Sequence, residues 1–264
     1  MLTGYKATSP TGEQTTSAVA INLEDISVRF RLPVERVSTV KEYAIRWLQR
    51  RLEYRDLWAL RGVAFSIGRG EIFGVVGANG AGKTTLLKVI ARVLHPTEGR
   101  VRVNGSVAPI LELGGGFHPE LTGRENVYLY GSLLGWTRRA LDDGFGDIVD
   151  FAELWDFIDA PLRTYSSGMT ARLAFAVAMA RYADVILVDE VLAVGDIQFQ
   201  EKCLALIDQY REEGSTIVVV SHNPGLITRM CARAIWLSHG DLLALGSAED
   251  VSEQYEYELS TSAD

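Results

Sequence analysis

The chain has 264 residues, 47% of them hydrophobic and 23% charged, so it can bury a sizeable core as one large domain or two small ones. Its formal net charge of −8 argues against general nucleic-acid binding, which needs a basic surface. No run approaches the roughly eighteen apolar residues that a membrane span needs, and the N-terminus lacks a signal-peptide profile. Cys203 and Cys231 lack metal-ligand spacing, so we expect a reducing, cytoplasmic environment.

The N-terminal part of the chain predicts a tail and two strands. Residues 1–19 are rich in Ser, Thr and Gly and are predicted to form a loose tail. Residues 20–30 alternate apolar and polar side chains, which predicts a strand with one polar face, and we expect Pro33 to break it. A second alternating run over 58–67 predicts another strand.

Between these strands, residues 31–58 carry an inserted segment with helical periodicity. One stripe is apolar and the rest of the helix is basic: Val40, Tyr43, Ala44, Trp47, Leu48 and Leu52 against Lys41, Arg46, Arg50, Arg51 and Arg55. A basic amphipathic helix can lie on a membrane surface or a partner, or it can pack on its own domain with solvated arginines. The large aromatic residues on the stripe favour an interface slightly over local packing.

The next segment predicts a phosphate-binding loop. Residues 72–76 are a short apolar run typical of a buried strand, residues 77–84 read G-x-x-x-x-G-K-[ST], and a helical pattern starts near Lys83 and continues to Leu94. Glycines let the backbone wrap a phosphate, and the helix N-terminus adds positive potential. We expect Lys83 to reach the β- and γ-phosphates and the Thr84 hydroxyl to bind Mg²⁺. The candidate nucleotide-binding residues are Gly77, Asn79, Gly80, Ala81, Gly82, Lys83, Thr84 and Thr85.

A hairpin and a helical insertion are predicted after this loop. Residues 99–107 have the pattern of a hairpin turned at Asn104-Gly105, and an apolar run follows over 108–113. Thr122 and Glu125 form a capping box that starts a helix, and Thr137 caps another. Because strands resume at Asp184, we expect a helical insertion within an α/β domain.

Two later strands end in polar residues. The run over 185–188 leads to Asp189 and Glu190, and the run over 215–221 leads to His222. At the carboxyl edge of a sheet we expect Asp189 to hold Mg²⁺, Glu190 to polarise an attacking water, and His222 to contact a γ-phosphate. As alternatives, the acids could cap the next helix and the histidine could be structural.

A second anion site is predicted at Ser166, Ser167 and Gly168, which open an alanine-rich helix. One chain does not need two such sites for one γ-phosphate. Two copies arranged head to tail do, because each can give its serine turn to the nucleotide of the other. The sequence therefore makes a dimer part of the expected mechanism.

Taken in chain order, the phosphate loop, the serine turn, the acidic strand end and the histidine resemble the motifs of the ATP-binding subunit of ABC transporters. The resemblance covers residues 20–258. Residues 77–84 resemble the Walker A loop, 165–169 the signature, 185–190 Walker B with the catalytic glutamate, Asp196 the D-loop and His222 the switch histidine. The resemblance implies an α/β fold of the P-loop NTPase class: a RecA-like mixed sheet core, an antiparallel β subdomain, a helical subdomain over 117–170 and a short tail over 259–264. It also implies ATP and Mg²⁺ as cofactors, a second copy of the chain and an integral-membrane permease as partners, and a place at the cytoplasmic face of the cell membrane.

The sequence departs from that family pattern at two places, the signature and the Q-loop. The signature has Tyr165, Ser167 and Met169 where Leu, Gly and Gln are usual, although Ser166 and Gly168 are kept. The Q-loop Gln is missing, and Glu112 is the nearest polar candidate. For the aromatic residue that stacks on adenine, Tyr54 has the usual separation from the Walker A loop, and Phe30 and Trp58 are alternatives.

These departures resemble one subgroup, the ATPase subunits of exporters that move lipid-linked polysaccharides such as O antigen, teichoic acid or capsule. The resemblance rests on residues 112–126, 165–169 and 189–196, and on the insertion over 31–58, which the subgroup places at the membrane interface. Some members carry a C-terminal carbohydrate-binding domain, and none is expected here after Asp264. The alternatives are an exporter of a lipid or drug, or a soluble ABC ATPase of DNA repair or translation, which typically has a coiled-coil insertion or tandem ATPase units.

Overall fold

The computed structural model describes residues 18–33, 54–111, 113–189 and 195–261. Its elements in chain order are β1 (Val19–Pro33), β2 (Tyr54–Gly68), β3 (Ile72–Val76), α2 (Lys83–Ile90), β4 (Glu98–Val103), β5 (Val107–Ile110), α3 (Gly123–Leu133), α4 (Arg138–Ala152), η1 (Leu162–Thr164), α5 (Ser167–Met179), β6 (Val185–Asp189), α6 (Ile197–Glu212), β7 (Thr216–Ser221), α7 (Pro224–Met230), β8 (Arg233–Ser238), β9 (Asp241–Ser247) and α8 (Ala248–Thr261). Among these described helices, none combines the length and apolar character needed to cross a bilayer.

A six-stranded sheet forms the centre of the fold, in the order β5-β6-β7-β3-β8-β9. All neighbouring pairs are parallel except β8 with β9. Every residue of β3 and β7 is buried, as expected of parallel strands covered on both faces. The mixed sheet core that the sequence implied is therefore confirmed.

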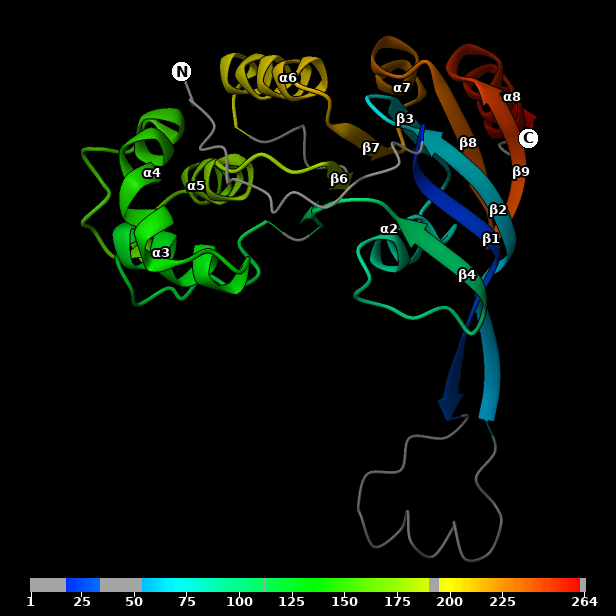
Figure 1. Ribbon diagram of the computed structural model, residues 1–264, viewed down its shortest axis with the longest axis horizontal. Helices are drawn as coiled ribbons and strands as arrows, with labels where there is room; N and C mark the ends of the chain where they lie inside the picture. The colour runs from blue at the N-terminus through cyan, green and yellow to red at the C-terminus, as the bar shows by residue number, and fades with distance from the viewer. Residues whose placement is uncertain (1–17, 34–53, 112, 190–194, 262–264) are drawn as a thin grey trace, which may run out of the picture.

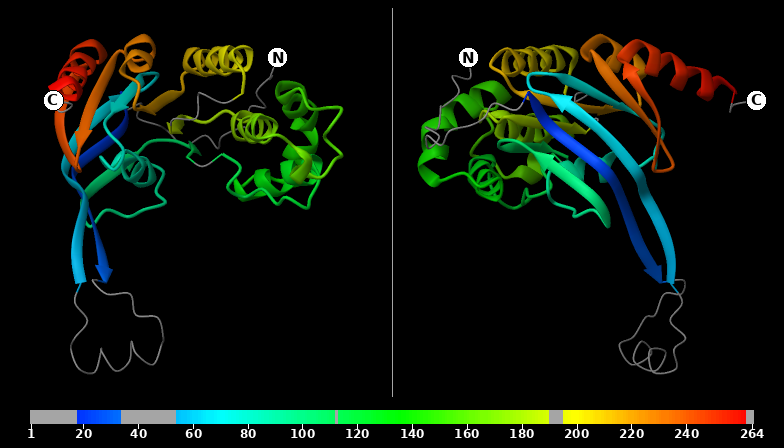
Figure 2. Two further views of the ribbon diagram at one scale, coloured as in Figure 1. Left: turned by 180° about the vertical axis from the view of Figure 1, so that it is seen from behind. Right: turned by 45° about the vertical axis from the view of Figure 1, so that its right-hand side comes forward.

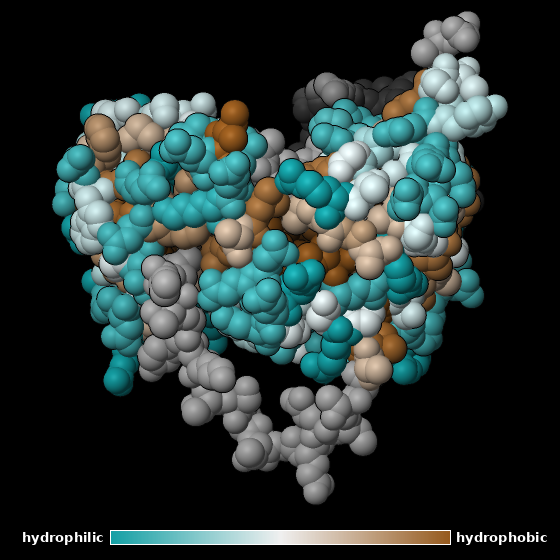
Figure 3. All heavy atoms as spheres, turned by 90° about the horizontal axis from the view of Figure 1, so that it is seen from above, coloured by the Kyte–Doolittle hydropathy of each residue, from teal (hydrophilic) through white to brown (hydrophobic). Residues whose placement is uncertain are grey.

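The two faces of this sheet pack against different layers. Alternate residues of β3 divide between them: Ile72 and Val76 belong to the core shared with α3–α8, whereas Phe73 and Val75 belong to the core shared with α2 and the smaller sheet. Figure 1 shows α6, α7 and α8 together along the upper side of the molecule. Seen from that side, the surface is largely hydrophilic, with hydrophobic residues gathered toward its middle (Figure 3).

The smaller sheet is antiparallel, in the order β2-β1-β4, and confirms the antiparallel β subdomain. Both views of Figure 2 show β1 and β2 running together well beyond the rest of the body. The described part of β1 ends at Pro33, the residue expected to break the strand, which pairs with Tyr54 at the far end of the ladder. Within the described residues β4 pairs with β1 only from Ile21 to Ser27, so the other edge of β1 needs no N–H at Pro33.

The strands β1 and β2 thus take up both ends of the segment that was predicted as an inserted helical region. Residues 31–33 and 54–58 are strand. The predicted amphipathic helix itself, with Trp47 and the arginines Arg46, Arg50 and Arg51, lies outside the described residues, as does most of the predicted N-terminal tail.

The predicted hairpin over residues 99–107 is wrong. Its two arms belong to different sheets, since β4 pairs with β1 and β5 pairs with β6. Asn104 donates its backbone N–H to the Ala20 carbonyl. Gly105 has φ 109°, and a Cβ added to it would stand 2.4 Å from that of Asp184. The Asn-Gly pair therefore turns the chain from one sheet into the other.

The helical subdomain consists of α3, α4 and α5 and forms the lobe on the left of Figure 1. Thr122 caps α3 in the predicted capping box with Glu125, and Thr137 caps α4 through the N–H of Ala140. The last helix of the lobe continues to Met179, beyond the predicted boundary at residue 170. Two helices outside this lobe also differ from their predicted bounds. Helix α2 ends at Ile90, short of the predicted Leu94, and α8 extends past residue 258 to Thr261.

Both cysteines are free and buried. Burial raises the pKa of Cys203 and of Cys231 to about 12, so both thiols stay protonated at neutral pH. This agrees with the expectation that the chain has no disulfide framework.

Candidate functional site

The predicted phosphate-binding loop joins β3 to α2, and two glycines fix where it lies. A Cβ on Gly77 would stand 2.3 Å from the carbonyl oxygen of Leu237 at the end of β8, and one on Gly82 would stand 2.5 Å from that of Ala59 in β2. Gly82 also has φ 106°, which disfavours any other residue. The loop is therefore pressed between the two sheets, with backbone on both sides.

Lys83 is the first residue of α2, and its side chain folds back over the loop. Its ammonium group donates to the carbonyl oxygens of Gly77 and Ala78, at 2.8 and 3.1 Å, and only 6% of the residue is exposed. A buried positive charge is thus held against the loop at a helix N-terminus, where the helix dipole also favours an anion.

Thr84 and Asp189 come together although they lie far apart in the sequence. The Thr84 hydroxyl donates to the Asp189 carboxylate at 2.9 Å, joining the start of α2 to the end of β6. A hydroxyl and a carboxylate at this separation form the oxygen donor pair that suits Mg²⁺ beside phosphate oxygens. The residues present therefore fit the MgATP that the sequence implies.

The strand order explains why a third candidate lies at the same edge. Strand β7 lies between β3 and β6, and all three run parallel, so their carboxyl ends are neighbours. His222 follows the last residue of β7 and is exposed. Glu190, the predicted catalytic glutamate, follows Asp189 directly and lies outside the described residues, so its role stays a prediction.

The remaining loop candidates surround Lys83. Asn79 and Gly80 are exposed at the tip of the loop. Ala81 is buried, and its carbonyl accepts the N–H of Gly240, which ties the loop to the turn after β8. Thr85 lies in the first turn of α2.

The predicted signature turn opens α5, as expected. Ser166 is the N-cap, and its hydroxyl accepts the Met169 N–H at 3.1 Å, while Ser167 and Gly168 begin the helix. Asp196 similarly caps α6 and accepts the Phe199 N–H at 2.9 Å. In Figures 1 and 2 the helical lobe that holds α5 lies well apart from α2, so the two predicted anion sites of one chain lie in different parts of the fold.

The candidates for stacking on adenine differ in their distance along β2 from the loop. Trp58 is next to Ala59, whose carbonyl contacts Gly82, and the Arg29 guanidinium lies 5.3 Å from its ring centroid. Tyr54 begins β2 at the far end of the ladder, and Phe30 pairs with Leu57 between them. Which of the three stacks on adenine stays a prediction, with Tyr54 as the first candidate. Glu112, the candidate for the Q-loop position, lies outside the described residues.

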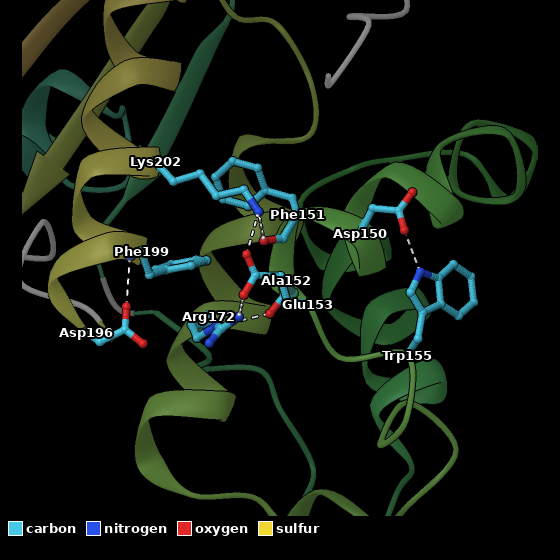
Figure 4. A network of polar contacts seen from close by, with 9 residues as sticks. All are labelled: Asp150, Phe151, Ala152, Glu153, Trp155, Arg172, Asp196, Phe199 and Lys202. Atoms are coloured by element: carbon cyan, nitrogen blue, oxygen red, sulfur yellow. Dashed lines mark hydrogen bonds and ion pairs between the residues drawn. The ribbon is translucent and has the colours of Figure 1, made fainter.

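One polar cluster was missed by the sequence analysis. It joins α4, α5 and α6 around Glu153, which pairs with Arg172 and Lys202 (Figure 4). No motif marks these residues in the sequence. The only available signal was the position of Arg172 within the helix that the signature turn opens.

The fold and site define the class of protein, and comparisons with known proteins agree. Residues 60–193 match the ABC transporter family. The chain is 47% identical over 204 residues to the O-antigen export system ATP-binding protein RfbB of Klebsiella pneumoniae, covering 77% of this chain and 83% of the relative. The chain belongs to the ABC transporter family and is an ATP-binding, ATP-hydrolysing subunit of it.

Two longer relatives extend the match along this chain. It is 42% identical over 246 residues to an O-antigen export system ATP-binding protein of Myxococcus xanthus, covering 91% of this chain and 56% of that protein. It is 39% identical over 241 residues to the teichoic acids export ATP-binding protein TagH of Lactococcus lactis, covering 91% and 51%. The chain therefore spans about half the length of these two relatives.

Solved structures confirm the fold at lower sequence identity. A dimeric post-hydrolysis state of the ATP-binding cassette MJ0796, bound to ADP and Pi, matches with a TM-score of 0.69 and 22% identity, over 86% of this chain and 98% of that one. The ATP-binding subunit of another ABC transporter matches with a TM-score of 0.69 and 20% identity, over 90% and 93%.

Proposed function

We propose that this chain powers the export of a lipid-linked polysaccharide through a membrane permease. The observation that carries the ATPase part is the hydrogen bond between Thr84 and Asp189, because it brings the phosphate loop and the acidic strand end to one point. Support for the cargo comes from relatives named for O-antigen and teichoic acid export, which match over most of this chain.

Each residue of the site has a chemical role in this proposal. Lys83 binds the β- and γ-phosphates, and Thr84 and Asp189 hold Mg²⁺, which would neutralise phosphate charge as the terminal bond breaks. Glu190 orients and polarises the attacking water, and His222 contacts the γ-phosphate. The adenine stacks on Tyr54, with Phe30 and Trp58 as alternatives.

The site is complete only with a second copy in this proposal. Ser166, Ser167, Gly168 and Asp196 of one subunit serve the nucleotide of the other, so two subunits close on two MgATP head to tail. Hydrolysis and release reopen the pair, and the motion drives the permease. The subunit works at the cytoplasmic face of the membrane, attached through the permease.

The test is reconstitution with the permease in liposomes. A lipid-linked polysaccharide should stimulate ATP hydrolysis and be transported, whereas a drug-like or simple lipid substrate should not. Lys83→Ala is the matched control, because it removes the phosphate contact and should abolish both readouts. Stimulation by a drug or lipid alone would instead favour an exporter of another substrate. A neighbouring gene for a multi-span permease beside glycosyltransferases would be independent support.

A further inference from the structure

The cluster around Glu153 has a backbone conformation that its side chain does not favour. Glu153 ends α4 with φ 57° and ψ 48°, in the left-handed region where glycine or asparagine is usual. A glutamate at such a position costs free energy relative to glycine. The role of this residue must therefore be sought in its carboxylate.

The Glu153 carboxylate bridges two cations from two other helices. One oxygen accepts from Arg172 of α5, and the other accepts from Lys202 of α6 at 3.0 Å (Figure 4). Both cations also reach the end of α4: Arg172 donates to the Ala152 carbonyl at 3.0 Å and Lys202 to the Phe151 carbonyl at 2.9 Å. These contacts satisfy helix-end carbonyls that have no partner within the helix.

An aromatic layer beneath the cluster joins the same three helices. Phe151 of α4, Phe175 of α5 and Phe199 of α6 pack ring against ring, with centroids 5.6 to 6.2 Å apart. Arg172 lies over the ring of Phe199 at 4.9 Å, and Lys202 lies over that of Phe151 at 4.7 Å. Stacked cations and shared partners make this a network, unlike an isolated surface pair.

The network lies next to two residues that the dimer proposal uses. Phe199 donates its backbone N–H to Asp196, the cap of α6. Arg172 lies less than two turns into α5, the helix that Ser166 caps. Within the described residues, Glu153 is thus the common ionic partner of the helix that carries the signature turn and the helix that carries the D-loop aspartate.

We propose that Glu153 is a positioning residue that holds the signature turn and the start of α6 as one unit, so that both reach the partner's nucleotide together. This inference rests on the head-to-tail dimer proposed above. Glu153 itself touches no nucleotide, and it acts through Arg172 and Lys202. The hydrogen bond from Lys202, together with Arg172, holds the pKa of its carboxyl below the usual value, so the charge that binds both cations persists at neutral pH.

The test uses two substitutions that both remove the charge of Glu153 and differ in their effect on the backbone. Glu153→Gln keeps the shape of the side chain and removes its charge, whereas Glu153→Gly removes the carboxylate and suits the left-handed backbone. Both should lower the kcat of ATP hydrolysis roughly fivefold, with the KM for ATP changed less than about twofold. Glu153→Gly should keep or raise the melting temperature, because glycine suits the left-handed backbone. A loss of activity in this stable variant would reflect the missing carboxylate, since a capping role alone predicts no such loss.

Asp159→Asn is the matched control. Asp159 makes a comparable exposed pair with Arg124 inside the helical lobe and contacts neither cation of the cluster. It should leave kcat within about twofold of the parent value. In the free subunit, amide hydrogen exchange in the first turns of α5 and α6 should rise in Glu153→Gln and not in Asp159→Asn.

Two results would overturn the proposal. One is unchanged kcat in both Glu153 variants. The other is unchanged hydrogen exchange at both helix starts in Glu153→Gln, which would show that the carboxylate does not hold them. A wild-type subunit that hydrolyses ATP without exporting polysaccharide would contradict the proposed function. The role of Glu153 could still be tested in that case, because kcat and hydrogen exchange do not depend on the cargo.

Discussion

The carboxyl edge of the large sheet and the helical lobe hold their functional groups in different ways. At the sheet edge, Lys83 follows the loop after β3 and Asp189 is the last residue of β6, and the residues of both strands are almost all buried. In the lobe and at α6, Ser166 and Asp196 are helix N-caps, steadied by the network around Glu153, whose side chain is 58% exposed. Burial of the strands fixes the groups at the sheet edge, whereas a partly exposed polar network steadies the two helix caps.

The difference matches what each region has to do in the proposed cycle. Groups that hold a chain's own nucleotide need one fixed geometry, and parallel strands in a close-packed core provide it. Groups that meet the partner's nucleotide must approach and withdraw. The network around Glu153 lets them do so as one unit, because it joins α5 and α6 to the end of α4. Substitutions in the two regions should therefore separate binding from hydrolysis.

The largest expected effect is at the signature turn. Ser166→Arg should reduce hydrolysis on the order of 1000-fold, because it blocks the group offered to the partner's nucleotide. Affinity of the isolated monomer for ATP should stay unchanged, since Ser166 lies in the other lobe. The measurement is steady-state ATPase beside ATP titration at a concentration that keeps the subunit monomeric. A parallel loss of monomer affinity would place Ser166 at its own chain's nucleotide and break the comparison.

The next effect concerns Glu190 at the sheet edge. Glu190→Gln should slow hydrolysis about 100-fold, because a general base is lost while the phosphate and metal contacts remain. The variant should still bind MgATP and should accumulate as an ATP-bound dimer on a sizing column. Near-normal turnover would remove Glu190 from the role of base.

A smaller effect is expected at the pair that joins α2 to β6. Thr84→Val keeps the volume of the side chain and removes the hydroxyl that meets Asp189. Monomer affinity for MgATP should fall about tenfold, because the oxygen proposed to bind Mg²⁺ is lost. Calorimetric titration without Mg²⁺ is the control, and the loss should be much smaller there. Equal losses with and without Mg²⁺ would argue against a metal site at this pair.

The smallest effect is at the start of the helical lobe. Thr122→Ala removes the N-cap of α3 and half of its capping box with Glu125, and should lower the free energy of unfolding by about 1 kcal/mol. Thr137→Ala removes an N-cap that has no reciprocal capping-box bond, and should lower the free energy of unfolding by less. Urea denaturation of both variants measures this. MgATP affinity of the monomer should be unchanged in both, and a drop would contradict the independence of the two regions.

Sequence reasoning located the sheet-edge residues because each one follows a local signal. The phosphate loop, the run before Asp189 and the cap at Thr122 depend on residues within a few positions of one another. The failures were non-local. Asn104-Gly105 has the composition of a hairpin turn, and only the long-range pairing of β4 with β1 and of β5 with β6 shows that it joins two sheets.

Glu153 illustrates the same limit. Glu153 shows no sign in the sequence of its left-handed backbone or of its two cationic partners. Its partners come from α5 and α6, so its role depends on the packing of three helices.

The position of β3 at the centre of the sheet has a consequence for how the chain folds. Its two neighbours, β7 and β8, both lie in the last quarter of the chain, from Thr216 to Ser238. During synthesis the apolar strand and its phosphate loop therefore leave the ribosome long before either neighbour exists. Such long-range parallel pairing is slow to form, and an unpaired apolar strand can associate with other chains. We expect the newly made N-terminal half to rely on chaperones, and the capacity to bind nucleotide to arise late, only once β8 has joined the sheet.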